Sequence, residues 1–122
     1  MMIHDQIRKK WIILTPEEWV RQHLIHYLIT EKNYPASTLA IEKMIELNDV
    51  KKRFDLVAYD NHMKPVLLAE CKAPYIDLSK DVLAQAERYN LVLNCRFFMI
   101  TNGLQHFVFE SNKLIEDLPH YK

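Results

Sequence analysis

The pattern of apolar and polar positions predicts a helix near the start of the chain. Between residues 15 and 31, apolar side chains recur every four positions, as on the buried side of a helix. Thr15 is a typical N-cap residue, and Pro16 fits the first helical position. The predicted buried stripe consists of Val20, Leu24 and Leu28. We expect this helix to end at the Asn33-Tyr34-Pro35 segment, because proline cannot continue it.

A period of two replaces the helical period further along the chain, which predicts strands. The predicted strands cover residues 38–47, 53–59, 66–72, 95–101 and 104–110. Residues 60–65 and the Asn102-Gly103 pair carry turn chemistry, and we expect a hairpin at each. A second helix is predicted over residues 77–94, where the apolar residues return to helical spacing.

This order of elements predicts an α/β (α+β) fold with a mixed central sheet flanked by helices. Short connections make the first three strands an antiparallel meander, and the second helix then carries the chain to a strand elsewhere in the sheet. An additional C-terminal strand follows. We expect the tail beyond residue 110 to fray. No repeat or linker interrupts the chain, so residues 1–122 are predicted to form one domain, with its core at about residues 15–110.

The composition excludes two classes of nucleotide-binding protein. The 122 residues contain a single glycine, Gly103. A phosphate-binding P-loop needs two glycines in a fixed frame, and a dinucleotide-binding fingerprint needs three, because the backbone must turn tightly beside the phosphates. These residues therefore contain neither an ATP-driven motor nor a Rossmann oxidoreductase.

Charge and cysteine content set weaker limits. Sixteen basic residues balance sixteen acidic ones, so the net charge does not favour nucleic-acid binding, although local patches matter more than the sum. Cys71 and Cys95 lack metal-binding spacing and are typical of a reduced, cytoplasmic protein. The first ten residues are polar, and the apolar runs are far shorter than the roughly 20 residues that span a bilayer. We expect neither a signal peptide nor a membrane span.

Two charged residues interrupt the otherwise apolar strand predicted over residues 66–72. Glu70 and Lys72 lie two residues apart, and side chains at that spacing project from the same face of a strand. Burial of one charge there is costly, and two charges indicate a functional site. Asp55 repeats the pattern on the preceding strand, where we expect it to share a face with Val57. The residues expected on the opposite face are Phe54, Leu56 and Ala58.

If the hairpin around residues 60–65 closes, Asp55 lies close enough to Glu70 to share a ligand. Two converging carboxylates repel each other, and a divalent hard cation removes that repulsion. Mg²⁺ is commonly held by one or two carboxylates together with water and a substrate phosphate, and Mn²⁺ is a suitable substitute. The adjacent Lys72 can orient the attacking water and balance phosphate charge. These residue types predict metal-assisted hydrolysis of a phosphodiester.

These residues carry a resemblance to known nucleases. Asp55 followed by Glu70-Cys71-Lys72 resembles the D…(D/E)xK signature of the PD-(D/E)xK superfamily, whose restriction-endonuclease-like core has the predicted αβββαβ order. Over about residues 15–110 the chain also resembles the N-terminal nuclease domain of type I restriction enzyme R subunits. The matching segments are Pro16-Glu17-Glu18-Trp19-Val20-Arg21-Gln22, Lys52-Arg53-Phe54-Asp55, Leu68-Ala69-Glu70-Cys71-Lys72-Ala73-Pro74, Gln85 with Tyr89, and Thr101-Asn102-Gly103.

The resemblance implies roles for the central residues. Asp55 and Glu70 would bind the metal ion, the backbone carbonyl of Cys71 would be a further ligand, and Lys72 would be the catalytic lysine. The usual proline before the aspartate is Phe54 here, a variation that leaves the aspartate in place.

The resemblance also implies a supporting set. The family's first-helix glutamate falls on Glu17 or Glu18, and Glu17 is preferred because it shares the helical stripe of the apolar residues. Gln85 and Tyr89 match the family's Q-x-x-x-Y element, which would support the site or contact DNA. The basic run at Lys52-Arg53 is a candidate phosphate-contacting patch.

The sequence thus predicts a Mg²⁺-dependent DNA endonuclease domain of a restriction-modification system. The alternative is a catalytically inactive nucleic-acid-binding or assembly module with the same fold, which the neutral charge and small size favour. The helicase motor of full R subunits is not present in these residues, which indicates a stand-alone relative or a fragment. Expected partners are DNA, a motor or methylase/specificity subunit, and a second copy of the chain, which would double the DNA-contacting surface.

Overall fold

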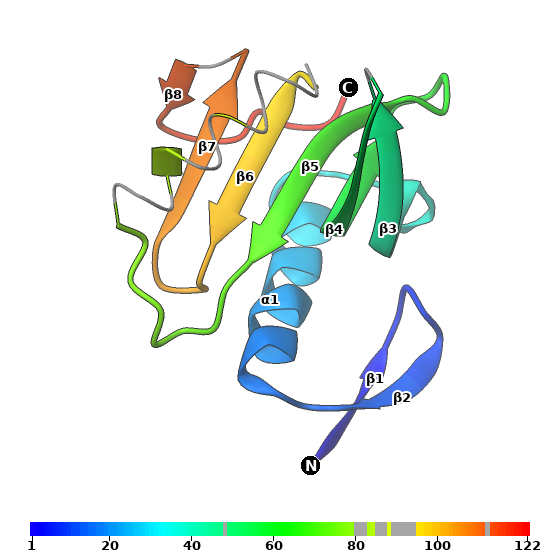
Figure 1. Cartoon of the computed structure of the whole chain (residues 1–122). Coiled ribbons are helices and arrows are strands. Elements are labelled where there is room, and N and C mark those ends of the chain that lie inside the picture. Colours follow the sequence, from blue (N-terminus) through cyan, green and yellow to red (C-terminus); the bar gives the residue numbers. More distant parts are fainter. Residues whose placement is uncertain (48, 80–82, 85–87, 89–94, 112) are drawn as a thin grey trace.

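The computed structural model describes the whole chain except residues 48, 80–82, 85–87, 89–94 and 112. The described part consists of a six-stranded sheet, a long helix against one face of it, and a separate two-stranded hairpin beside that helix (Figure 1). The elements are β1 (Met2–Asp5), β2 (Lys10–Ile13), α1 (Pro16–Thr30), the short 3₁₀ helix η1 (Ala36–Thr38), β3 (Leu39–Leu47), β4 (Val50–Tyr59), β5 (Pro65–Cys71), β6 (Phe97–Thr101), β7 (His106–Glu110) and β8 (Lys113–Ile115).

The predicted α+β fold with a mixed sheet is confirmed. The strand order is β3-β4-β5-β6-β7-β8; β5 and β6 are parallel and the other neighbours are antiparallel. The meander of β3, β4 and β5 is therefore as predicted, and the long connection after β5 returns the chain to a neighbouring parallel strand. The second helix predicted over residues 77–94 falls largely outside the described residues.

The helix α1 begins where the sequence predicts. The Thr15 hydroxyl accepts a hydrogen bond of 3.1 Å from the backbone N–H of Glu18, and Pro16 occupies the first turn. The predicted stripe is buried against the sheet, joined by Ile25. Burial of each such large aliphatic side chain contributes about 1.5–3 kcal/mol, so the stripe fixes α1 on this face of the sheet.

The core has two parts, one on each face of the sheet. The first lies between α1 and the face formed by alternate residues of β4, β5 and β6, including Leu56, Leu67 and Met99. The second covers the opposite face and includes Leu68 and Phe98. All five residues of β6 are buried, as expected for a strand covered on both faces.

Three peripheral segments differ from the predictions. The leader before α1 forms the β1–β2 hairpin, which was not predicted. The β6–β7 connection has four residues, 102–105, because the Asn102 carboxamide accepts backbone N–H bonds from Leu104 and Gln105. The tail does not fray: it forms β8, and Leu118 is 1% exposed.

Candidate active site

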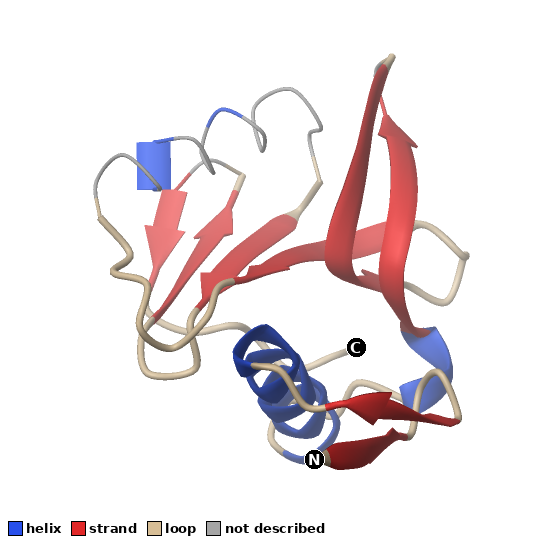
Figure 2. Cartoon of the chain, turned by 60° about the horizontal axis from the view of Figure 1, so that its bottom comes forward, coloured by secondary structure: helices blue, strands red, loops and turns tan. Residues whose placement is uncertain are grey.

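Asp55 lies where the outer half of the β3–β4 hairpin leaves the sheet. The β4–β5 pairing runs to Leu56 opposite Ala69, and Glu42, which stands opposite Asp55 in register, has a left-handed backbone with φ 51°. Figure 2 shows this part of β3 and β4 standing away from the other strands. The divergence of the strands leaves room for the Asp55 side chain between α1 and β5.

The predicted alternation along β4 is wrong at this point. Phe54 was expected beside Leu56 on the helix-facing side, but it packs in the opposite core with Val57. The physical reason is the bend: the outer hairpin changes direction between these residues, so strict period-two projection does not continue through Asp55. As a result, the Asp55 carboxylate reaches residues on both α1 and β5.

The two oxygens of Asp55 have different partners. Oδ1 accepts a hydrogen bond of 3.0 Å from Arg21 Nη2 on α1, and Oδ2 accepts one of 2.7 Å from the backbone N–H of Cys71 at the end of β5. The second bond takes the place of a ladder hydrogen bond where the strands separate. Asp55 is thereby tied to β5 one residue from Glu70, with its side chain 20% exposed.

Glu70 and Asp55 converge, as the sequence predicted. The Glu70 side chain is 17% exposed and accepts a hydrogen bond of 2.9 Å from Lys52 Nζ. Burial raises the pKa of Glu70; Lys52 opposes this effect, while the charge of Asp55 and a hydrogen bond shared with its carboxyl add to it. The two carboxylates therefore lie within hydrogen-bond reach of each other and are hereafter called the acidic pair.

Cys71 and Lys72 continue from Glu70 toward β6. The Cys71 side chain points into the helix-facing core, and burial raises the pKa of its thiol, so the thiol stays protonated at neutral pH. Only its backbone carbonyl is then a donor suited to a hard cation. Lys72 is half-buried and its backbone N–H donates to Thr101 O at 2.8 Å, which extends the β5–β6 ladder past Cys71.

The preference for Glu17 over Glu18 is wrong in geometry. Glu17 is exposed, whereas Glu18 is buried one turn before Arg21. Glu18 Oε1 receives Arg21 Nη1 at 2.6 Å, and Arg21 continues to Asp55. The site therefore lies along the edge of α1 that carries Glu18 and Arg21, beside the predicted apolar stripe, because residues three apart share a face of a helix.

Three residues of the site were missed by sequence reasoning. Arg21, 7% exposed, bridges Glu18 and Asp55; burial disfavours its cation, but these carboxylates outweigh that cost and raise its pKa. Arg8, in the turn between β1 and β2, places Nη2 2.7 Å from Glu18 Oε1. Asp5 is fully buried and anchors Arg8. The Glu18-x-x-Arg21 spacing on a buried stripe was the available signal for Arg21.

The supporting residues fall in different places. Gln85 and Tyr89 lie outside the described residues. Lys52 faces the acidic pair through Glu70, with Nζ also 5.0 Å from the Phe54 ring centroid. Arg53 is exposed on the outer hairpin and pairs with Glu42 at 3.6 Å.

The residues present fit a hard divalent cation. Asp55, Glu70 and the Cys71 carbonyl offer only oxygen donors, the ligand type that Mg²⁺ and Mn²⁺ take, and Mg²⁺ commonly uses no more than two protein carboxylates. Arg21 and Lys52 neutralise one oxygen of each carboxylate. Among the described residues, no group of three or more His, Cys, Asp or Glu side chains is arranged to hold a metal by itself.

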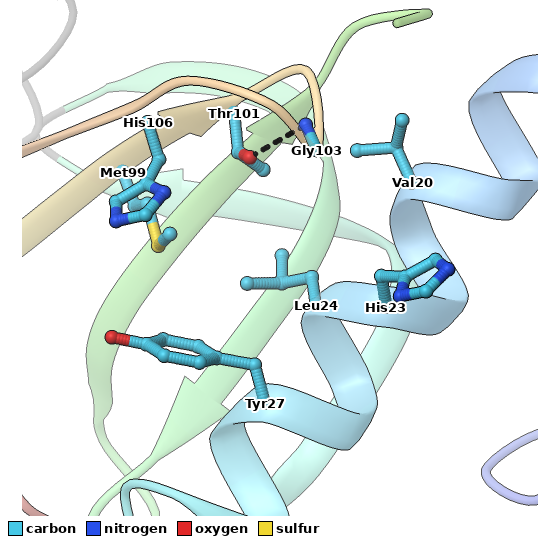
Figure 3. A pocket seen from close by; sticks show the side chains of 8 residues that line it. All are labelled: Val20, His23, Leu24, Tyr27, Met99, Thr101, Gly103 and His106. Atoms are coloured by element: carbon cyan, nitrogen blue, oxygen red, sulfur yellow. Dashed lines mark hydrogen bonds between the residues drawn. The ribbon is translucent and has the colours of Figure 1, made fainter.

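A cavity with a volume of about 210 Å³ lies between α1 and the β6–β7 turn (Figure 3). His23 and His106 stand at its sides, and Tyr27 lies below them. Its hydroxyl groups already have partners: Tyr27 donates to Asp117, and Thr101 Oγ1 accepts from the Gly103 N–H and donates to Gln105 O. This cavity is separate from the acidic pair.

The fold and the site together define a nuclease-like protein. The chain is similar to the crystal structure of a DUF820 protein from Anabaena variabilis that is described as a candidate nuclease. The two share 11% sequence identity with a TM-score of 0.55, over 88% of this chain and 70% of the other. This likeness supports the restriction-endonuclease-like fold.

The sequence places the chain more narrowly. Residues 16–120 match the family model of the type I restriction enzyme R protein N terminus, and the chain belongs to that family. No curated protein matches the chain. None of the described helices is long and apolar enough to cross a membrane.

Proposed function

We propose that the chain is a Mg²⁺-dependent endonuclease domain that hydrolyses phosphodiester bonds of DNA. The observation that carries the proposal is the convergence of Asp55 and Glu70 at the end of β5, followed directly by Lys72. Family membership supports a nuclease-like domain of a restriction-modification system. DNA and the other subunits of such an enzyme are the partners we propose, in the cytoplasm.

The acidic pair has the role of metal ligand in this proposal. Asp55 and Glu70 would hold the metal ion together with the Cys71 carbonyl, and the bound ion would polarise the scissile phosphate and lower the pKa of water. The hydrogen bond from the Cys71 N–H already holds the Asp55 side chain in position. Metal binding would therefore not have to order that side chain. Mn²⁺ would serve in place of Mg²⁺ because it takes the same oxygen ligands.

The cations around the pair complete the site. Lys72 follows Glu70 by two residues and would orient the attacking water and balance the charge of the phosphate. Lys52 contacts Glu70, and its positive charge beside the acidic pair would attract the DNA backbone. Arg53, exposed on the outer hairpin, would contact the DNA backbone further from the metal.

Cleavage of plasmid DNA in Mg²⁺ or Mn²⁺ tests the proposal. Asp55→Asn and Lys72→Met are expected to abolish cleavage while the protein stays folded. Matched controls are Asp60→Asn, in the β4–β5 turn, and Lys113→Met, exposed on β8; both should cut like the wild type. The proposal fails if the wild-type protein cuts no DNA with either ion, or if cleavage survives both active-site substitutions.

A second candidate is a catalytically inactive module that binds nucleic acid or assembles with other subunits. The observation that favours it is that Arg21 and Lys52 already neutralise the acidic pair, so the fold does not need an ion to hold these carboxylates. Calorimetric titration with Mn²⁺ separates the two. Binding that disappears in Asp55→Asn supports the enzyme, and no binding at millimolar Mn²⁺ supports the module.

A further inference from the structure

The β1–β2 hairpin, residues 2–13, reaches the candidate active site although it precedes the residues that match the family model, 16–120. Figure 2 shows the hairpin lying alongside α1. Its turn carries Arg8, whose side chain is 18% exposed and directed at the N-terminal half of α1. The hairpin therefore contributes a cation to a site that the family region alone leaves without it.

Arg8 is held on the hairpin by a fully buried carboxylate. Asp5 Oδ1 accepts the backbone N–H groups of Ile7 at 2.7 Å and Arg8 at 3.0 Å. Asp5 Oδ2 accepts Arg8 Nε and, at 3.2 Å, Gln22 Nε2 from α1. Burial disfavours the Asp5 carboxylate, yet these hydrogen bonds and the Arg8 charge lower its pKa overall. One guanidinium edge is thus fixed, and the other edge is presented to the helix.

The Arg8 guanidinium also forms an ion pair with Glu18. Arg8 Nη2 lies 2.7 Å from Glu18 Oε1 in an ion pair that lacks hydrogen-bond geometry. The same oxygen accepts a hydrogen bond of 2.6 Å from Arg21 Nη1, and Gln22 Nε2 lies 3.2 Å from Glu18 Oε2. The Glu18 carboxylate, 7% exposed, therefore has cations or donors on both oxygens. In this structure the Glu18 carboxylate therefore serves to hold the two arginines.

Arg21 transmits this arrangement to Asp55. Its Nη1 is bonded to Glu18 and its Nη2 to Asp55 at 3.0 Å, while Nε is buried without a hydrogen-bond partner in the described part of the chain. The position of the guanidinium is thus set by these two carboxylates, with Glu42 Oε1 a more distant ion-pair partner at 3.9 Å. A displacement of Glu18 would move Arg21, and with it the Asp55 oxygen that Arg21 orients.

We infer that Arg8 is a positioning residue of the active site, which fixes Glu18 and, through Glu18 and Arg21, the carboxylate of Asp55. The inference rests on the proposed nuclease function. Arg8 touches neither the acidic pair nor the expected position of the substrate. Loss of a residue that orients a metal ligand typically lowers metal affinity or activity by about ten- to a hundred-fold.

The test compares two double variants that differ in one side chain. Removal of Arg8 alone would leave the buried Asp5 charge unpaired, so both variants carry Asp5→Asn, whose amide oxygen still accepts the turn N–H bonds. Arg8→Gln then removes the cation beside Glu18, whereas Arg8→Lys keeps one. Lys9→Gln, which removes a charge from the exposed neighbouring position of the same turn, controls for the overall field.

Three quantities are measured on the full chain: the thermal midpoint without metal, the Mn²⁺ affinity by calorimetry, and kcat and KM for DNA cleavage. We expect Asp5→Asn/Arg8→Gln to remain folded, to bind Mn²⁺ more weakly, and to lose about ten- to a hundred-fold in kcat with KM unchanged. Asp5→Asn/Arg8→Lys should recover most of both losses, and Lys9→Gln should match the wild type.

The inference is overturned if the Gln double variant folds and matches the wild type in Mn²⁺ affinity and kcat, or if the Lys variant is as impaired as the Gln variant. A wild-type protein that neither binds Mn²⁺ nor cuts DNA would overturn the proposed function, and the inference with it. A wild type that does both, together with an indifferent Gln variant, overturns only the role of Arg8.

Discussion

Two carboxylates flank Asp55 and are held in opposite ways. On the side of α1, the two oxygens of Glu18 are contacted by two arginines and a glutamine. On the side of β5, Glu70 has Lys52 as its ion-pair partner and shares its site with the like charge of Asp55. The first arrangement gives a fixed support, and the second leaves negative charge that a bound cation would neutralise.

Ionisation has opposite effects in the two regions. In the anchor network, formed by Asp5, Arg8, Glu18 and Arg21, hydrogen bonds lower the pKa of Asp5. In the acidic pair, burial and the neighbouring Asp55 raise the pKa of Glu70. Folding therefore stabilises the charged form of Asp5 in the anchor network and disfavours the charged form of Glu70 in the acidic pair. Such separation of support from reactive group is typical of a preorganised site.

The largest expected difference is in cleavage. Glu70→Gln should abolish metal-dependent DNA cleavage, because it removes half of the acidic pair. Glu18→Gln should leave residual cleavage, about ten- to a hundred-fold below the wild type, because Glu18 acts through Arg21. Plasmid cleavage at equal concentrations of folded protein measures both. Equal loss in the two variants would remove the distinction between support and metal ligand.

The next largest difference is in the stability of the metal-free protein. Glu18→Gln leaves Arg8 and Arg21 without their shared carboxylate, and loss of one partner of a buried ion pair typically costs about 3–5 kcal/mol. Urea denaturation measures the free energy of unfolding. Glu46→Gln, an exposed glutamate on β3, is the matched control and should change it by less than about 0.5 kcal/mol. A loss for Glu18→Gln as small as that of the control would show that Glu18 is not a support.

A smaller effect of opposite sign is expected at Glu70. Because its pKa is raised in the folded protein, the folded state retains the Glu70 proton at a pH where the unfolded state has lost it. Its contribution to stability is present below the unfolded pKa and is lost as pH rises through the folded pKa. Glu70→Gln should therefore increase the thermal midpoint of the metal-free protein at pH 7, and a decrease would contradict this account.

The smallest effect concerns acid sensitivity of the anchor network. The pKa of Asp5 is lowered on folding, so its stabilising contribution is present above the unfolded value of 3.8 and is lost as pH falls through the folded value. The free energy of unfolding, measured by urea between pH 5 and pH 2, should fall less steeply in Asp5→Asn than in the wild type. An unchanged slope would show that Asp5 is not held as a carboxylate.

Much of this molecule was accessible from local sequence. Thr15 and Pro16 set the start of α1, the alternation along β5 placed Glu70 and Cys71 on opposite sides, and the turn at residues 60–65 closed the hairpin that brings Asp55 near Glu70. These features depend on the period of the element and on adjacent residues, which a sequence displays directly.

The supporting half of the site was not accessible in the same way. The sequence predicted no role for Arg8, and Glu17 was preferred over Glu18 from apolar spacing. Both outcomes depend on how the β1–β2 hairpin packs beside α1 and on the bend at Asp55. Those are contacts between different elements of the fold, and no local periodicity encodes them.

The sequence by itself thus determined the first helix, the strands β3 to β7 with their order, and the acidic pair with its neighbouring lysine, since these follow from side-chain period and residue chemistry. Only the tertiary structure decided which carboxylate supports the site and which arginines hold it. A buried charge is stable only where partners from several elements meet around it, and that meeting place is set by the packing of the whole domain.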